Sequence, residues 1–452
     1  MKIIIAGTGK VGGILARQLV LEDHEVTLID SDSSVLESTV EQYDVMTVYG
    51  NCAVKDVLKE AGIEDADLLI ATTGSDETNL LCCVTAHSMN GELHTIARIR
   101  NPEYGQQLYD MRDIFALSMQ INPDKQAATE IERLLKYPGF LKLDTFAKGR
   151  VEIVELRVEE DSNLCNTSLL QLTNKVKTKI LVCTVLRDGN VITPDGSFIL
   201  QSGDRIFVTA PTNQLTQLLK NLGIITRKIK HVLICGGSRI SYYLSKKLVQ
   251  SGIDVTIIEN DMEKCLRLSS DLPEVNVVNG DASSSYRLES EGIEGCDALV
   301  ALTGLDELNI IISLYGHAHK VPNIVTKLDY IDDNSILDFL PQSSVVTPKE
   351  LGCNTIVRYV RAMQNQTGAA AAVHFIADGK AEAIEFRIDR NTPHCSEPLK
   401  NLKLRRGVLI ACITKRGKTE IPDGNSSYAP GDSVIVVTNT SSIIHNFSDI
   451  FE

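Results

Sequence analysis

Residues 2–12 read KIIIAGTGKVG, and this stretch decides the fold of the first part of the chain. A short apolar run leads directly into three glycines, Gly7, Gly9 and Gly12, which open a segment long enough for a helix. In such a strand–turn–helix unit the first glycine permits the tight turn and the second lets the backbone approach a pyrophosphate. The third lets the helix pack closely on the strand. The free N–H groups at the start of the helix would attract phosphates.

An acidic residue stands where a turn of this kind needs one. Asp30 closes the second apolar run, eighteen residues after Gly12. Its carboxylate can accept hydrogen bonds from ribose hydroxyls and would repel a 2′-phosphate, so the pattern favours NAD(H) or an adenosine nucleotide over NADP(H). We therefore predict a nucleotide site. The alternative is a glycine-rich turn retained for packing.

Further polar residues stand where the third to fifth strands are expected to end. Those of the third and fourth strands are either ligand contacts or cap and turn residues. Arg98, on the fifth, is a candidate phosphate partner or an ordinary solvated or ion-paired arginine, and Lys10 is either bound or solvated. The residues predicted for the first site are Gly7, Thr8, Gly9, Lys10, Val11, Gly12, Asp30, Asn51, Cys52, Thr72, Thr73, Asp76 and Arg98.

The chain repeats itself. Blocks of similar sequence recur in constant order, each 228 to 230 residues further along: Ile4–Gly12 as Leu233–Ser241, Val26–Asp30 as Val255–Glu259, Val48–Asn51 as Val278–Asp281, Ala71–Glu77 as Ala301–Glu307, and Pro194–Gly196 as Pro422–Gly424. Such a repeat indicates a tandem duplication of a two-domain unit, joined near residues 226–230.

The pattern of apolar and polar residues in each half predicts an α/β chain. Apolar runs alternate with helix-length segments through residues 1–121, which indicates a doubly wound parallel sheet. Val151–Val158 alternates apolar and polar residues with period two, as a half-buried antiparallel strand does. We expect two Rossmann-like domains, each followed by a small α+β domain. The predicted boundaries are 1–125 and 227–350 for the nucleotide-binding domains, 126–146 and 351–372 for crossover-helix linkers, and 147–226 and 373–452 for the small domains.

The second half carries an altered version of the first site. Serines replace the second and third glycines, at Ser238 and Ser241, while Glu259 keeps an acid at the same spacing. This second site binds a different nucleotide, binds weakly or has become structural. Its predicted residues are Gly236, Ser238, Arg239, Glu259 and Asp281.

Composition narrows the class of protein. The formal net charge of −14 disfavours nucleic acid as a partner, because broad binding to phosphates needs Lys and Arg. The eleven cysteines are scattered without a C-x-x-C pair, which favours a reducing cytoplasm over a disulfide framework or a metal site. Glycines interrupt the apolar N-terminal run early, and no later run is long enough for a membrane span, so we expect neither a secreted nor a transmembrane chain.

The tandem layout, the Gly7–Gly12 loop, Asp30 and the block Ala71–Asn79 resemble the regulatory subunits of bacterial Trk potassium-uptake systems, the TrkA family, over the whole chain. In that family each half is an RCK (or KTN) unit with a nucleotide-binding N-domain and a small C-domain. The resemblance implies a cytoplasmic homo-oligomer, dimeric or tetrameric, bound to the inner face of the membrane at a potassium-translocating integral subunit (TrkH/TrkG-like). It implies that NAD(H) at the first site, and ATP, ADP or NAD(H) at either site, modulates potassium flux. The family's dinucleotide contacts map onto Gly7, Gly9, Gly12, Asp30, Thr72, Thr73 and Arg98.

Two other functions stay open from the residues alone. The same fold carries NAD-dependent oxidoreductases, which need an acid or base placed over the nicotinamide. We find no histidine arrangement suited to that role and expect no catalysis. The second alternative is a regulator of another cation transporter.

Overall fold

The computed structural model of the chain describes all residues except 41–42, 138–139, 147–149, 161, 176–178, 212–214, 222–227, 330–342, 364–369, 378, 440–443 and 445. By compactness the chain divides into two units. The first comprises Met1–Ala128 with Thr347–Tyr359, and the second comprises Thr129–Val346 with Val360–Glu452. The division expected from the sequence repeat, into two nucleotide-binding domains, two crossover-helix linkers and two small domains, stays a prediction.

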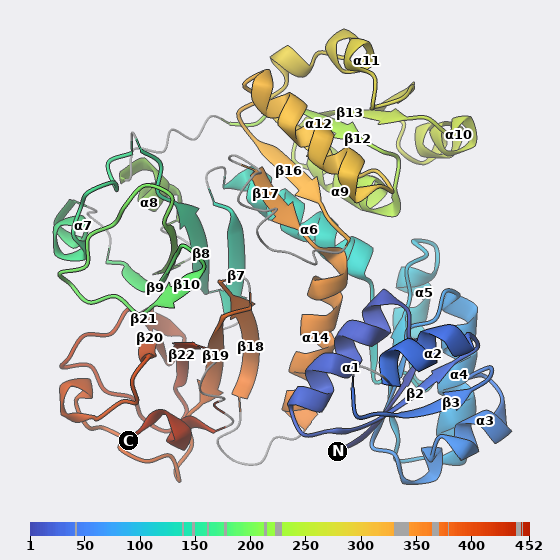
Figure 1. Cartoon of the computed structure of the whole chain (residues 1–452), viewed down its shortest axis with the longest axis horizontal. Coiled ribbons are helices and arrows are strands. Elements are labelled where there is room, and N and C mark those ends of the chain that lie inside the picture. The colour runs from blue at the N-terminus through green and yellow to red at the C-terminus, as the bar shows by residue number, and fades with distance from the viewer. Residues whose placement is uncertain are drawn as a thin grey trace. The chain divides into compact units, whose positions relative to one another are not determined.

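The first sheet is six-stranded and parallel, with the strand order β3-β2-β1-β4-β5-β6. Helices lie on both of its faces (Figure 1). The strands are β1 (Lys2–Ala6), β2 (Glu25–Asp30), β3 (Met46–Tyr49), β4 (Leu68–Ala71), β5 (His94–Arg98) and β6 (Met119–Ile121). The helices are α1 (Lys10–Leu21), α2 (Ser33–Val40), α3 (Lys55–Glu60), η1 (Ile63–Asp65), α4 (Asp76–Met89) and α5 (Tyr104–Asp110). The predicted Rossmann-like fold of the first half is confirmed.

The central strands of this sheet are buried because both faces are covered. Every residue of β4 is inaccessible to solvent, and so are Leu15 and Leu19 on the inner face of α1. Cys82 and Cys83 of α4 are also fully buried, as expected for core residues rather than reactive thiols. The order places β1 next to β4, and ligands bind at such a switch point, outside the carboxyl ends of the strands.

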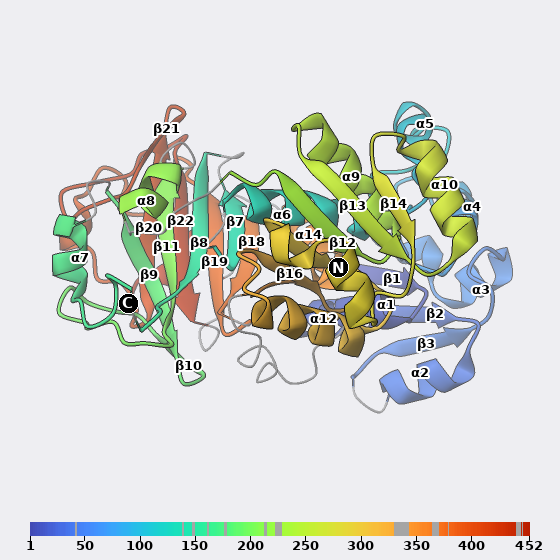
Figure 2. The ribbon, with the colours of Figure 1, turned by 90° about the horizontal axis from the view of Figure 1, so that it is seen from above.

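The second half repeats this architecture with the order β14-β13-β12-β15-β16-β17, again all parallel. Figure 2 shows α9 and α10 on one face of the sheet and α12 on the other. The strands are β12 (His231–Cys235), β13 (Asp254–Glu259), β14 (Asn276–Asn279), β15 (Ala298–Ala301), β16 (Ile324–Lys327) and β17 (Ser343–Val346). The helices are α9 (Arg239–Gln250), α10 (Met262–Asp271), α11 (Ser285–Ser290), η3 (Ile293–Gly295) and α12 (Asp306–Ala318).

Long helices follow each parallel sheet: α6 (Pro123–Lys136) and α14 (Pro348–Met363). Most of α14 belongs to the first compact unit, although its sequence belongs to the second half of the repeat. There Cys353 is fully buried, with its sulfur 3.6 Å from the carbonyl oxygen of Val11 at the start of α1. Among the described residues, no helix combines the length and apolar character needed to cross a membrane.

Two antiparallel five-stranded sheets complete the chain, with the orders β10-β9-β11-β8-β7 and β18-β19-β22-β20-β21. The first has β7 (Lys142–Phe146), β8 (Val151–Arg157), β9 (Leu181–Arg187), β10 (Asn190–Ile192) and β11 (Arg205–Pro211), with α7 (Leu169–Lys175) and α8 (Leu215–Asn221). The second has β18 (Ala370–Ile376), β19 (Ala381–Arg387), β20 (Val408–Lys415), β21 (Lys418–Glu420) and β22 (Ser433–Asn439), with η4 (Leu399–Asn401) and η5 (Phe447–Ile450).

β8 differs from its sequence pattern. Its alternation predicts one solvated face, yet Glu152 and Glu155 are each only 4% exposed. Glu152 accepts a hydrogen bond from Arg133 of α6 at 3.0 Å, and Glu155 pairs with Arg205 on β11. The expectation of a half-buried strand is therefore wrong. Glu152 and Glu155 lie on opposite faces of the strand, and an arginine from a neighbouring element satisfies the carboxylate on each face.

Candidate functional site

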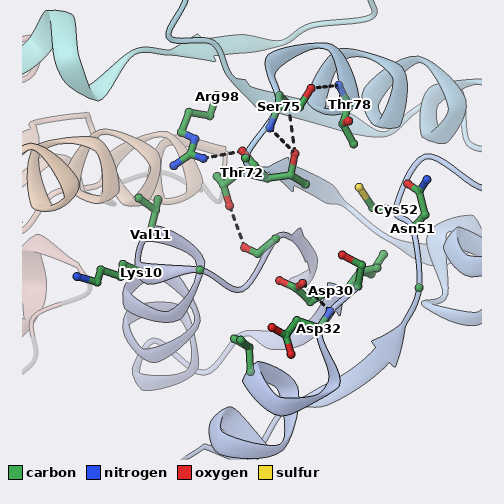
Figure 3. A pocket seen from close by; sticks show the side chains of 18 of the residues that line it. Lys10, Val11, Asp30, Asp32, Asn51, Cys52, Thr72, Ser75, Thr78 and Arg98 are labelled. Atoms are coloured by element: carbon green, nitrogen blue, oxygen red, sulfur yellow. Dashed lines mark hydrogen bonds between the residues drawn. The ribbon is translucent and has the colours of Figure 1, made fainter. Parts of the chain in front are cut away.

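A cavity of about 710 Å³ lies at the carboxyl edge of the first sheet (Figure 3). Its size is in the range of small-molecule sites. Of the residues predicted from the sequence, the structure brings ten to this cavity: Gly7, Gly9, Lys10, Val11, Asp30, Asn51, Cys52, Thr72, Thr73 and Arg98. Three others are not in its lining: Thr8, Gly12 and Asp76.

Gly7 and Gly9 of the loop between β1 and α1, and Gly12 in the first turn of α1, meet different surroundings. A Cβ on Gly7, whose φ is +94°, would lie 2.8 Å from the backbone nitrogen of Thr73, and one on Gly12 would lie 2.0 Å from the carbonyl oxygen of Gly7. A Cβ on Gly9 would meet nothing within 4 Å. Packing alone therefore requires glycine at positions 7 and 12, whereas Gly9 leaves open space beside the cavity.

Asp30 is held in place by the glycine loop itself. Its Oδ2 accepts hydrogen bonds from the backbone N–H and the hydroxyl of Thr8, both at 2.6 Å. Its Oδ1 accepts one from the N–H of Asp32 at 3.0 Å. An ionised carboxylate has about four acceptor positions, so Asp30 can still receive a ribose hydroxyl. Thr8, only 4% exposed, thus orients Asp30 from behind the cavity.

The turn between β4 and α4 closes the other side of the cavity. Thr72 donates its hydroxyl to the carbonyl oxygen of Gly7 at 3.1 Å, which ties this turn to the glycine loop. Thr73 is fixed by Asn79, whose Oδ1 accepts from both its N–H and its hydroxyl. Arg98 donates from Nη2 to the carbonyl oxygen of Thr73 at 2.5 Å. Figure 3 shows Arg98 across the cavity from Asp30, so opposite charges line its two sides.

Asp76 is not among the lining residues of the cavity, and its side chain anchors a loop. Its Oδ2 accepts from the backbone N–H groups of Arg100 and Asn101, both at 2.8 Å, and its side chain is buried. These bonds fix the segment that follows β5. Ligand contact by Asp76 stays a prediction, and its observed partners are those of an anchoring carboxylate.

Cys52 lines the cavity beneath Asn51, whose Oδ1 accepts from the N–H of Ala53 in a turn. A hydrogen bond from Cys82 lowers the pKa of the Cys52 thiol, and the same pairing raises the pKa of Cys82. Cys52 is only 5% exposed, so its thiol forms part of the cavity wall.

Several residues that line the first cavity were not predicted from the sequence. Those close to the recognised motifs could have been found from their positions at strand ends or caps: Ile29, Ser31, Asp32, Val35, Gly50, Gly74, Ser75 and Thr78. Lys349 lines the same cavity from α14, in the other half of the repeat. No local signal identifies it, because only the fold brings α14 to the first domain.

The second site has a different loop. Ser238 caps α9 by accepting from the N–H of Ser241, and Ser241 donates its hydroxyl to the carbonyl oxygen of Gly236 at 2.5 Å. This loop therefore accommodates a Cβ at the third glycine position, which the first loop would not. The two serines bond to the backbone groups that a phosphate would approach.

The acidic residue of the second site is also more deeply buried than Asp30 of the first. Glu259 is 6% exposed and accepts from the N–H of Gly237 at 2.5 Å. Arg239, the first residue of α9, is exposed, and Asp281 accepts from the N–H of Ser283 at 2.8 Å in a turn. Hydrogen bonds from Ser283 lower the pKa of Asp281. The loop, Glu259 and Asp281 occupy the positions expected from the repeat, while their contacts are within the protein.

Comparison with known families shows to which family the chain belongs. The model of the TrkA-N domain matches residues 3–116 and 232–348, and that of the TrkA-C domain matches residues 153–223. The chain belongs to the TrkA family. The TrkA homolog of Archaeoglobus fulgidus is 31% identical over 437 residues, covering 96% of this chain and 97% of the homolog. The Trk system potassium uptake protein TrkA of Haemophilus influenzae is 29% identical over 464 residues, covering 100% and 99%.

Solved structures support the same fold for this TrkA family member. The crystal structure of the GsuK RCK domain aligns with a TM-score of 0.63 at 19% identity, covering 97% of this chain and 92% of that one. A GsuK channel bound to NAD aligns with a TM-score of 0.62 at 19% identity, covering 97% and 77%. The tandem RCK architecture expected from the resemblance is confirmed.

Proposed function

We propose that this chain is the nucleotide-sensing regulatory subunit of a Trk-type potassium-uptake system. Binding of NAD(H) or an adenine nucleotide in the cavity of the first domain shifts the conformation of the chain and so controls potassium flux through a membrane partner. The observation that carries this proposal is the cavity between the Gly7–Gly12 loop and Asp30 in a member of the TrkA family.

The lining of the cavity suits the parts of such a ligand. Asp30 accepts from the adenosine ribose hydroxyls, and the open space beside Gly9 lets the pyrophosphate reach the N–H groups at the start of α1. Arg98 and Lys10 add positive charge to the same cavity. A carboxylate at position 30 disfavours a 2′-phosphate, so NAD(H), ATP and ADP are the proposed ligands and NADP(H) is not.

The second site is proposed as the weaker of the two. ATP, ADP or NAD(H) would have to replace the Ser238 hydroxyl at the backbone N–H of Ser241 and approach Glu259, which already accepts from Gly237. Two unequal sites on one chain supply two separate inputs, because a ligand shifts a conformation only by its differential affinity for the two states.

The proposed partner is a potassium-translocating integral membrane subunit of the TrkH/TrkG type, with this chain as a dimer or tetramer on the cytoplasmic face. Curated relatives carry the name of the Trk potassium uptake system. The net charge of −14 would complement the Lys- and Arg-rich cytoplasmic loops of such a subunit. Nucleic acid is not a proposed partner.

Calorimetry on the full chain with NADH, NAD, ATP and ADP tests the binding part of the proposal. We expect saturable binding of at least one of these ligands, and no heat with any of them would overturn the proposal. Steady hydride turnover over a substrate panel would instead establish an oxidoreductase. Copurification of a membrane protein that transports another cation would replace the potassium assignment.

A further inference from the structure

Lys349 is the one side chain from the second half of the repeat in the described lining of the first cavity. It is half-buried and is the second residue of α14. The helix comes directly after β17, the last strand of the second sheet. A ligand in the first cavity therefore lies against a residue that the chain supplies from the second half.

The part of α14 in the first unit is packed firmly enough to hold Lys349 there. Cys353 is fully buried beside Val11. A Cβ on Gly352 would lie only 3.0 Å from Cγ of Pro123, so the helix approaches closely at this residue. Further along, the hydroxyl of Tyr359 lies 3.0 Å from Nδ1 of His94.

The packing also places Lys349 at the phosphate end of the cavity. Residues four apart share one face of a helix, so Lys349 lies on the same side of α14 as Cys353. Cys353 contacts Val11 in the first turn of α1, which is where the glycine loop presents its N–H groups. Asp30, which would bind the ribose, lies across the cavity from Arg98 (Figure 3). Arg98 and Lys10 are the other two cationic residues in the described lining of the cavity.

We propose that Lys349 binds a phosphate group of the nucleotide in the first site. This inference rests on the proposed function and deepens it. The ammonium donates a charge-assisted hydrogen bond to a phosphate oxygen, so the bound nucleotide joins the glycine loop of the first domain to the crossover helix of the second half. Occupancy of the first site then stabilises the arrangement in which α14 is docked, which gives the ligand its differential affinity.

The test is a calorimetric titration of the full chain with ADP and with adenosine, comparing wild type with Lys349→Ala. The first site is identified as the ADP binding that Gly9→Ala weakens and the adenosine binding that Asp30→Ala weakens. We expect Lys349→Ala to weaken ADP binding at this site about tenfold or more and to leave adenosine binding unchanged, because adenosine has no phosphate. Lys349→Arg should keep most of the affinity for ADP.

Lys59→Ala is the matched control, since Lys59 is an exposed lysine of the same domain outside the cavity lining, and it should bind ADP as wild type does. Equal ADP affinity in Lys349→Ala and wild type would overturn the inference alone. So would an equal loss of ADP and adenosine binding, which indicates a structural effect. A wild-type chain that binds none of ADP, ATP, NAD or NADH would overturn the proposed function itself.

Discussion

Gly9, at the N-cap of α1, and Gly12, in the first turn of the helix, meet different constraints. At Gly12 the limit is the protein, because a Cβ would lie 2.0 Å from the carbonyl oxygen of Gly7. At Gly9 a Cβ would meet nothing within 4 Å, so the protein itself does not exclude a side chain there. This contrast separates the role of the loop in folding from its role in binding.

Gly12→Ala is expected to lower the free energy of unfolding by about 1–3 kcal/mol, as overpacking of a tight contact does. Gly13→Ala, the neighbouring helical position with open space around it, should be neutral or stabilising by up to about 1 kcal/mol. Thermal unfolding of both variants checks this. A wild-type midpoint for Gly12→Ala would contradict the close approach of α1 to the loop.

Gly9→Ala should leave the thermal midpoint unchanged and weaken nucleotide binding at the first site about tenfold or more, because the new methyl group fills the space needed by the pyrophosphate. Calorimetry with ADP and NADH measures the affinity. Unchanged binding in a stable Gly9→Ala variant would show that the ligand does not approach this residue.

Asp30→Ala is expected to weaken binding of NAD(H), ATP and ADP about tenfold or more, since it removes the charged acceptor for the ribose. The same side chain also holds Thr8, so Asp30→Asn, which keeps the shape, is the companion variant. Asp56→Ala, an exposed acid on α3, serves as the control. Unaltered affinity in both Asp30 variants would reject the role of the carboxylate.

At the scale of elements, α6 carries a largely half-buried charge cluster against the first small sheet. Arg133 lies 3.4 Å from Glu130 and 3.0 Å from Glu152, and Asp144 and Lys142 of β7 act on Glu130 as well. Burial raises the pKa of Glu130 to about 7, although Arg133 opposes the shift. This carboxyl therefore keeps its proton in the folded chain at a pH where the unfolded chain loses it.

The raised pKa predicts a pH dependence of stability. As the pH rises from about 4.5 to about 7 the unfolded chain releases the proton first, so the free energy of unfolding falls over this range and levels off above it. Glu130→Gln should remove this fall and stabilise the chain at pH 8 by up to about 3 kcal/mol.

Thermal midpoints between pH 5 and pH 8 provide the check, with Glu160→Gln, an exposed carboxylate of the same compact unit, as the control for loss of a carboxylate. Parallel pH profiles for Glu130→Gln and wild type would contradict the assignment.

Much of the fold and of the first site followed from local pattern. The strands β1 and β2, the Gly7–Gly12 loop and Asp30 are contiguous signals with a known spacing, so the structure places them as expected. Lys349 could not be found in this way, because its role depends on where α14 packs.

The burial of Glu152 was missed for a related reason. Period-two alternation reports which side chains are polar, and Arg133 from another element decides whether that face is solvated. Asp76 shows that a position at the end of a strand does not by itself establish contact with a ligand. It stands at the correct strand end, yet its Oδ2 accepts from backbone N–H groups of Arg100 and Asn101.

At the scale of the whole molecule, the two small sheets share one hydrophobic core within the second unit. Phe146, Ile153 and Phe207 of the first sheet belong to the same buried cluster as Ala411 and Ile435 of the second. The duplicated halves are therefore joined by a core and not only by the chain.

Phe207→Ala is expected to destabilise both small sheets together by about 3–5 kcal/mol, because it opens a cavity in their common core. Hydrogen exchange should show lost amide protection in β19 and β22 as well as in β8 and β11. Ile199→Ala, at a position 53% exposed, is the control. Unchanged protection in the second sheet would show that the two sheets unfold independently.

Control of potassium flux by nucleotide in the first site can be measured as flux through the reconstituted membrane subunit with the full chain bound. NADH, NAD, ATP and ADP would be added in turn to complexes carrying the wild-type chain or Gly9→Ala. We expect that at least one nucleotide changes the flux with the wild-type chain and that this response is lost with Gly9→Ala. Flux that ignores every nucleotide, or responds equally with both chains, would contradict it.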